Sequence, residues 1–171
     1  MIVALMAGCC LSVMAQSWLP FKERAAGQAE WKKHEAVALL DSTGVVVADN
    51  GSGSFTIRQV VQVKNKAGAL KYRVIKYDYD PLTAFAEFSR ATVYKADGSQ
   101  RTIDVAQACD YAAPARAIYW GARQIMLEIG ALDAGDIIDY EISKKGFTYA
   151  LLAADDEERF VPPMRGQFYD I

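Results

Sequence analysis

Only two side chains in this sequence could form the centre of a catalytic site. They are the one histidine, His34, and the one cysteine outside the apolar N-terminal run, Cys109. A cysteine nucleophile needs a nearby base to take its proton and a third group to orient that base. His34 lies between Lys33 and Glu35, which is typical of a solvated helix end, and Cys109 lies in an alanine-rich stretch that favours a small buried hydrophobe. We therefore predict no catalytic residues and no enzyme activity, and a cysteine hydrolase using Cys109 is the third hypothesis for function.

The acidic residues also lack the spacing of metal ligands. Asp78 and Asp80 resemble the start of a calcium loop, but the further oxygen ligands and the glycine of such a loop do not follow. A turn before Pro81 is the favoured interpretation. The run Asp155–Glu158 is typical of a solvated loop, with calcium or a basic partner as the alternative. We expect no metal and no cofactor.

Aromatic and basic residues gather in the alanine-rich stretch from Ala106 to Gly121, where the β pattern fails and Pro114 would break a helix. An irregular loop that carries four such residues could form a lip that binds a sugar or a peptide. These candidate ligand-binding residues are Tyr111, Arg116, Tyr119 and Trp120. Packing of the aromatic rings over a sheet edge is the favoured alternative.

Length and charge limit the remaining function classes. A chain of 171 residues has room for one domain with its own core, and a formal net charge of −2 with mixed signs gives no basic surface for nucleic acid. Residues 1–15 are apolar and uncharged, are too short to span a bilayer, and end in Val13-Met14-Ala15, which predicts a cleaved signal peptide. Lipid anchoring through Cys9 is the less favoured alternative. We expect an exported protein of the periplasm or cell surface, with no transmembrane segment in the mature chain.

The rest of the chain predicts a mainly β domain that follows a short helix. Residues 16–35 form a helical lead-in, because Phe21–Glu35 is rich in helix formers and has no β-branched residue. Residues 36–171 form the expected β domain, in which five or more segments alternate apolar and polar residues with a period of two, as in antiparallel strands with one solvated face. We expect hairpins over Phe85–Val105, with a tight turn at Asp97-Gly98, and over Ile125–Ile142. Strands are also expected at Ala36–Asp49, at Phe55–Val63, from Leu70 to Val74, and at Phe147–Ala154. The end, Phe168–Ile171, looks like the start of another strand, so we expect an interrupted chain.

Three patterns in order along the chain carry a resemblance to a known family. They are the apolar run Ala36–Asp41, the hairpin Ala91–Gly98 and the segment Leu132–Glu141. Together they resemble the domain of unknown function numbered 3857, which lies at the N-terminus of exported bacterial proteins that carry a transglutaminase-like domain. The resemblance implies a two-sheet antiparallel β domain, similar to a sandwich, that precedes a papain-like Cys-His-Asp module. No such module follows here, so none of its catalytic residues has a counterpart in this sequence.

The favoured function is therefore a non-catalytic accessory domain outside the cytoplasm, acting as a spacer or a docking surface. Its expected partner is a downstream transglutaminase-like domain or an envelope protein. The alternative is a module that binds glycan or peptide through the loop from Tyr111 to Trp120.

Overall fold

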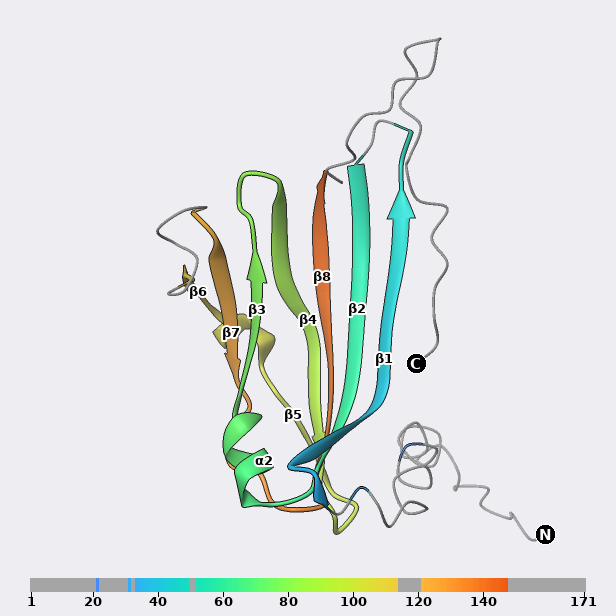
Figure 1. Cartoon of the computed structure of the whole chain (residues 1–171), viewed down its shortest axis with the longest axis vertical. Coiled ribbons are helices and arrows are strands. Elements are labelled where there is room, and N and C mark those ends of the chain that lie inside the picture. Colours follow the sequence, from blue (N-terminus) through green and yellow to red (C-terminus); the bar gives the residue numbers. More distant parts are fainter. Residues whose placement is uncertain (1–20, 22–30, 32, 50–51, 114–120, 148–171) are drawn as a thin grey trace, which may run out of the picture.

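The computed structural model describes Phe21, Trp31 and residues 33–49, 52–113 and 121–147. Within these residues the chain forms two antiparallel sheets (Figure 1). The larger sheet has the order β1-β2-β8-β4-β5 and the smaller one the order β3-β7-β6. The bounds of the elements are β1 Ala36–Val47, β2 Ser52–Val63, α2 Lys66–Lys71, β3 Val74–Tyr79, β4 Ala84–Tyr94, β5 Gln100–Thr102, η2 Val105–Gln107, β6 Cys109–Ala112, β7 Arg123–Glu128 and β8 Ile137–Phe147. The prediction of a mainly β, two-sheet antiparallel fold is confirmed.

The main core lies between the two sheets and follows the predicted alternation. In β2, Val61 and Val63 are buried in this core and Ile57 packs against it, while Val60 faces the other side of the sheet. Strands β3, β4, β7 and β8 bury their alternate apolar residues in the same way. Their buried members are Ile75, Tyr79, Ala86, Phe88, Ala91, Val93, Ile125, Leu127, Ile138, Tyr140 and Ile142.

A second, smaller cluster lies on the opposite face of the large sheet. Leu39, Val60, Tyr94 and Ile137 are buried there, and the side chains of Phe21 and Trp31 pack against them. The Arg58 guanidinium carbon also lies 5.6 Å from the centre of the Phe21 ring. The N-terminal aromatic residues therefore cover apolar surface of the large sheet. Most of the predicted helical lead-in, and all of the predicted signal peptide, lies outside the described residues.

The predicted hairpin over Ile125–Ile142 is wrong. Strand β7 belongs to the small sheet, whereas β8 pairs with β2 and β4 in the large one. The connection between them crosses from one sheet to the other: the Ile129 N–H donates to the Arg73 carbonyl, and the Gly135 N–H donates to the Val63 carbonyl, both at 2.8 Å. Apolar and polar residues alternate in the same way whether β7 and β8 form a hairpin or lie in different sheets, so the alternation alone could not distinguish the two arrangements.

The segment before β3 also differs from its prediction, because Leu70 lies in helix α2 and not in a strand. The Asn65 side chain caps this helix by accepting a hydrogen bond from the Gly68 N–H at 3.0 Å. Gly68 packs closely against the backbone of Glu35, where a Cβ atom would lie 2.0 Å from the Glu35 oxygen. Leu70 is 73% exposed, and the strand begins only at Val74.

The turn at Gly98 is confirmed, with φ of 92° at this glycine and a hydrogen bond from the Lys95 N–H to the Ser99 carbonyl at 2.8 Å. The predicted return strand to Val105 is wrong, since β5 ends at Thr102. The Asp104 side chain accepts a hydrogen bond from the Ala106 N–H at 3.1 Å and so starts the 3₁₀ turn η2. Val105 belongs to that turn.

Two buried aspartates join the motifs on which the family resemblance rests. Asp136, 1% exposed, accepts hydrogen bonds from the Lys95 ammonium at 2.7 Å and from the Asp133 N–H at 2.8 Å. Asp139 in β8 is held by Arg58 of β2 and Arg90 of β4, each with one contact of 2.9 Å. The segment Leu132–Glu141 therefore fixes the hairpin and the centre of the large sheet.

Candidate functional site

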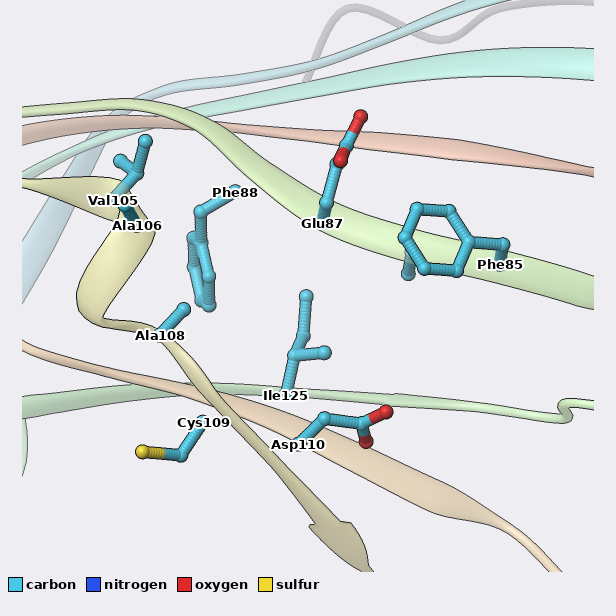
Figure 2. Close-up of a pocket in the computed structure, with 10 residues that line it drawn as sticks. Phe85, Glu87, Phe88, Val105, Ala106, Ala108, Cys109, Asp110 and Ile125 are labelled. Atoms are coloured by element: carbon cyan, nitrogen blue, oxygen red, sulfur yellow. The ribbon is translucent and has the colours of Figure 1, made fainter.

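An open cavity of about 330 Å³ lies between the two sheets, beside the first half of β4. Side chains from β4, η2, β6 and β7 surround it (Figure 2). Its apolar lining consists of Phe85, Ala86, Phe88, Val105, Ala106, Ala108 and Ile125. Figure 2 shows Phe88, Ala108 and Ile125 directed into the space between the strands.

The cavity exists because small residues face large ones. Phe88 and Ile125 are buried and form its floor, while Ala86 and Ala108 are too short to fill the space between them. Phe85, at the beginning of β4, is 57% exposed. The site therefore combines a recess and an exposed aromatic ring, which together offer apolar contact to another molecule.

One carboxylate at the edge of the cavity, that of Asp110, is already engaged in hydrogen bonds. The Asp110 carboxylate accepts hydrogen bonds from the Tyr79 hydroxyl at 2.8 Å and from Arg123 Nε at 2.9 Å. Burial, followed by the bond to Asp110, raises the pKa of Tyr79, and the same carboxylate raises the pKa of Arg123. Asp110 thus links β6 to β3 and β7, and its carboxylate already has two hydrogen-bond partners within the protein.

Cys109 is exposed, so the prediction that it is a small buried hydrophobe is wrong. It starts the edge strand β6, its Sγ is turned away from the cavity in Figure 2, and it lies 3.7 Å from the Gln107 carbonyl. His34 is also exposed, and its carbonyl accepts a hydrogen bond from Asn65 Nδ2 at 3.4 Å near the cap of α2. The two residues are thus placed on different elements, with different neighbours.

The predicted ligand-binding lip is described only in part. The stretch expected to be irregular contains η2 and strand β6, and Tyr111 lies in that strand with 52% of its surface exposed. Hydrogen bonding with Cys109 raises the pKa of Tyr111. Tyr111 stands opposite Gln124, which in turn stands opposite Asp78 and donates to it at 2.6 Å. The other candidate residues, Arg116, Tyr119 and Trp120, lie outside the described residues.

Metal-ligating residues do not gather in the described part of the chain, where no group of three or more His, Cys, Asp or Glu side chains is arranged to hold an ion. The Asp80 carboxylate accepts a hydrogen bond from the Leu82 N–H at 2.9 Å, so a turn is present, but it begins at Pro81 and not, as predicted, before it. The described helices are all too short or too polar to cross a membrane.

Sequence reasoning missed the cavity itself. Its walls come from β4 and from η2–β6, which are separated in the chain by the Gly98 turn and by β5. Ala108 was a usable signal, since a small residue that packs against a core leaves space. Only the structure shows which large residues stand opposite.

Two comparisons found proteins that resemble this chain. A family model described as "Domain of Unknown Function with solved-structure structure (DUF3857)" matches residues 49–171. One solved structure, described as that of "a putative protease from Parabacteroides distasonis ATCC 8503", is similar over 71% of this chain, with a TM-score of 0.56 and 14% identity. The chain covers 25% of that protein, and a likeness at this identity concerns the fold alone. A comparison with curated proteins gave no match.

Proposed function

The chain belongs to the DUF3857 family, and on that premise we propose that it is a non-catalytic accessory domain that docks a neighbouring polypeptide outside the cytoplasm. The partner is a transglutaminase-like domain or another envelope protein. The spacer role follows from the docking role, because a domain that binds its neighbour also fixes the neighbour's position.

One observation carries this proposal: the apolar cavity beside β4 with the exposed ring of Phe85. A volume of about 330 Å³ lies at the lower limit for small-molecule sites, so it fits one or two side chains. Its lining is mostly apolar, and Asp110 is occupied by Tyr79 and Arg123. Such a surface gains free energy by burying apolar area, roughly 25 cal/mol per Å², and has no polar groups arranged for chemistry.

Binding of a separate domain tests the docking role. A transglutaminase-like domain from a member of the family, added in trans, should bind the wild-type chain in calorimetry. Phe85→Ser should weaken that binding by roughly tenfold, which corresponds to about 1.4 kcal/mol. Leu82→Ser is the matched control, since Leu82 is 83% exposed on the neighbouring turn and does not line the cavity. Equal binding by wild type and Phe85→Ser would contradict the proposal.

Export is tested separately. Expressed with its native upstream region, the protein should yield a mature N-terminus near Gln16, because Val13-Met14-Ala15 has the small residues that signal peptidase prefers. A cytosolic chain that retains Met1 would show that the export hypothesis is wrong.

A second candidate function has its own observation. Tyr111 is half exposed on the outer face of the small sheet, in a row with the Gln124 amide and the Asp78 carboxylate. An aromatic face beside amide and carboxylate groups suits a sugar ring, which stacks on the first and hydrogen-bonds the others. Binding on a glycan array that is lost in Tyr111→Ala would favour this function over docking at the cavity.

A further inference from the structure

Strand β4 has an open edge over its first half. On one side β4 pairs with β8 along its whole length, from Ala84 to Tyr94. On the other side it pairs with β5 only over Thr92–Tyr94, with one further bond from the Ile103 N–H to the Ala91 carbonyl. In the described part of the chain, no strand pairs with this edge from Ala84 to Arg90. Backbone donors and acceptors on such an edge are a template for another strand.

The open edge and the cavity occupy the same segment. Phe85, Ala86 and Phe88 line the cavity and also belong to the unpaired part of β4. A strand added to this edge would lie about 4.8 Å from β4, and its alternate side chains would point to opposite faces. Those on the inner face would point toward the cavity, as Ala86 and Phe88 do. Edge pairing and a side-chain recess are the two parts of strand-addition sites, which take affinity from the first and specificity from the second.

An exposed carboxylate on the outer face of β4 favours a basic residue at one position of an added strand. Glu87 is exposed, and among the described residues its carboxylate has no ion pair or hydrogen bond. Figure 2 shows that its side chain points away from Phe88 and Ile125, although Glu87 also lines the cavity. A residue directly opposite Glu87 on an added strand would share its face, where opposite charges attract. The segment Ala84–Phe88 also has no lysine or proline to block pairing, and the register shift at Phe88/Arg90 marks its end.

We infer that β4 accepts an extended peptide strand in which a lysine or arginine, opposite Glu87, is flanked on both sides by large apolar residues. The flanking side chains fill the cavity, and the basic side chain pairs with Glu87. This inference rests on the proposed docking function and specifies how the neighbouring polypeptide is held.

Fluorescence anisotropy with a defined peptide tests it. The probe is a labelled peptide of sequence Thr-Thr-Phe-Lys-Phe-Thr-Thr, and its partner probe carries Glu in place of Lys. Wild type should bind the Lys peptide more tightly than the Glu peptide, and Glu87→Lys should reverse that order, with changes of roughly tenfold each way. Asp49→Lys is the matched control, because Asp49 is another exposed carboxylate, placed after the end of β1 and away from the cavity. It should leave both affinities unchanged.

Hydrogen exchange gives an independent measurement. The Lys peptide should protect backbone amides within Ala84–Phe88 of wild type. No binding of either peptide, an affinity order that Glu87→Lys does not change, or protection elsewhere in the chain would each overturn the inference. If the transglutaminase-like domain still binds in a Phe85-dependent way under those results, docking stands and strand addition alone is wrong. If the peptide binds as expected and the domain does not, the edge site stands without that partner.

Discussion

Replacing Asp139 by asparagine should destabilise the large sheet, because this carboxylate joins three strands. Its side chain is 3% exposed and accepts hydrogen bonds from Arg58 at 2.9 and 3.0 Å and from Arg90 at 2.9 and 3.3 Å. Asparagine keeps the shape of the side chain but removes the negative charge and one acceptor oxygen. Two guanidinium groups then lie side by side, and the Glu141 carboxylate, 3.8 Å from Arg90, is the nearest remaining counter-charge.

The size of the effect follows from how well water can replace the lost partner. Removing one member of a fully buried ion pair costs about 3–5 kcal/mol. Here the side chains of Arg58 and Arg90 are 34% and 39% exposed, so both can be partly rehydrated. We therefore expect a loss of about 2 kcal/mol in the free energy of unfolding, which lowers the melting temperature by roughly 4–8 °C for a chain of this size.

The pKa of Asp139 also predicts how the stability loss in Asp139→Asn changes with pH. Burial would raise the pKa of Asp139, but the hydrogen bonds and charges of Arg58 and Arg90 outweigh it, so the folded pKa lies below the ordinary value. The unfolded carboxyl titrates at about 3.9. A group with a depressed folded pKa stabilises the protein above its unfolded pKa, and this contribution is lost as the pH falls through the folded pKa. The difference in free energy of unfolding between wild type and Asp139→Asn should therefore be largest at neutral pH and decrease as the pH falls through the folded pKa.

Urea unfolding followed by circular dichroism, at neutral pH and at a pH below the folded pKa, measures both effects. Glu141→Gln is the control: its carboxylate lies 3.8 Å from Arg90 and is 28% exposed, so its loss should cost less than about 1 kcal/mol. An Asp139→Asn variant with the wild-type midpoint at neutral pH would refute the reasoning. So would a difference that is equally large in acid.

Three further substitutions test separate features by thermal or urea unfolding. Gly68→Ala should lower the free energy of unfolding by about 1–2 kcal/mol, because the new Cβ would lie 2.0 Å from the Glu35 carbonyl oxygen. Helix propensity alone would instead raise it by about 1 kcal/mol. A variant more stable than wild type would contradict this packing. Gly98→Val should cost about 1–2 kcal/mol through backbone strain only, since φ is 92° and no atom lies within 4 Å of the new Cβ; an unchanged melting curve would place the turn elsewhere. Burial raises the pKa of Tyr140 to about 12, so the wild type should lose stability as the pH rises from the unfolded value near ~10 through the folded one, and Tyr140→Phe should lose less over that range.

Strand positions and buried faces could be predicted because they depend on local alternation. Val61 and Val63 face the main core as their spacing requires, and the glycine at 98 has the positive φ that its turn needs. The pairing of strands could not be predicted in the same way. Strand β8 takes partners from β2 and β4, far along the chain, and nothing in its alternation specifies them.

Tertiary contacts decided the other differences. Helix α2 depends on the close approach of Gly68 to Glu35, which no local pattern contains, whereas its Asn65 cap is a local signal. The exposure of Cys109 depends on β6 being a sheet edge. For the candidate site, the exposed Tyr111 could be selected from sequence as an aromatic in an alanine-rich stretch where the β pattern fails. The cavity could not, since its opposing walls come from separate elements.

The central position of β8 has a consequence for how the chain assembles during synthesis. Arg58 and its partner Asp139 are 81 residues apart, and β8 separates β2 from β4 throughout the large sheet. Until residues 137–147 have been synthesised, β2 and β4 have no strand between them and the large sheet cannot form, whereas β3, β7 and β6 of the small sheet can already pair. Pairings of such long range are slow to form, since loop closure must precede them. The nascent chain should therefore remain accessible to chaperones and proteases until translation passes β8, and then complete the sheet in one late step.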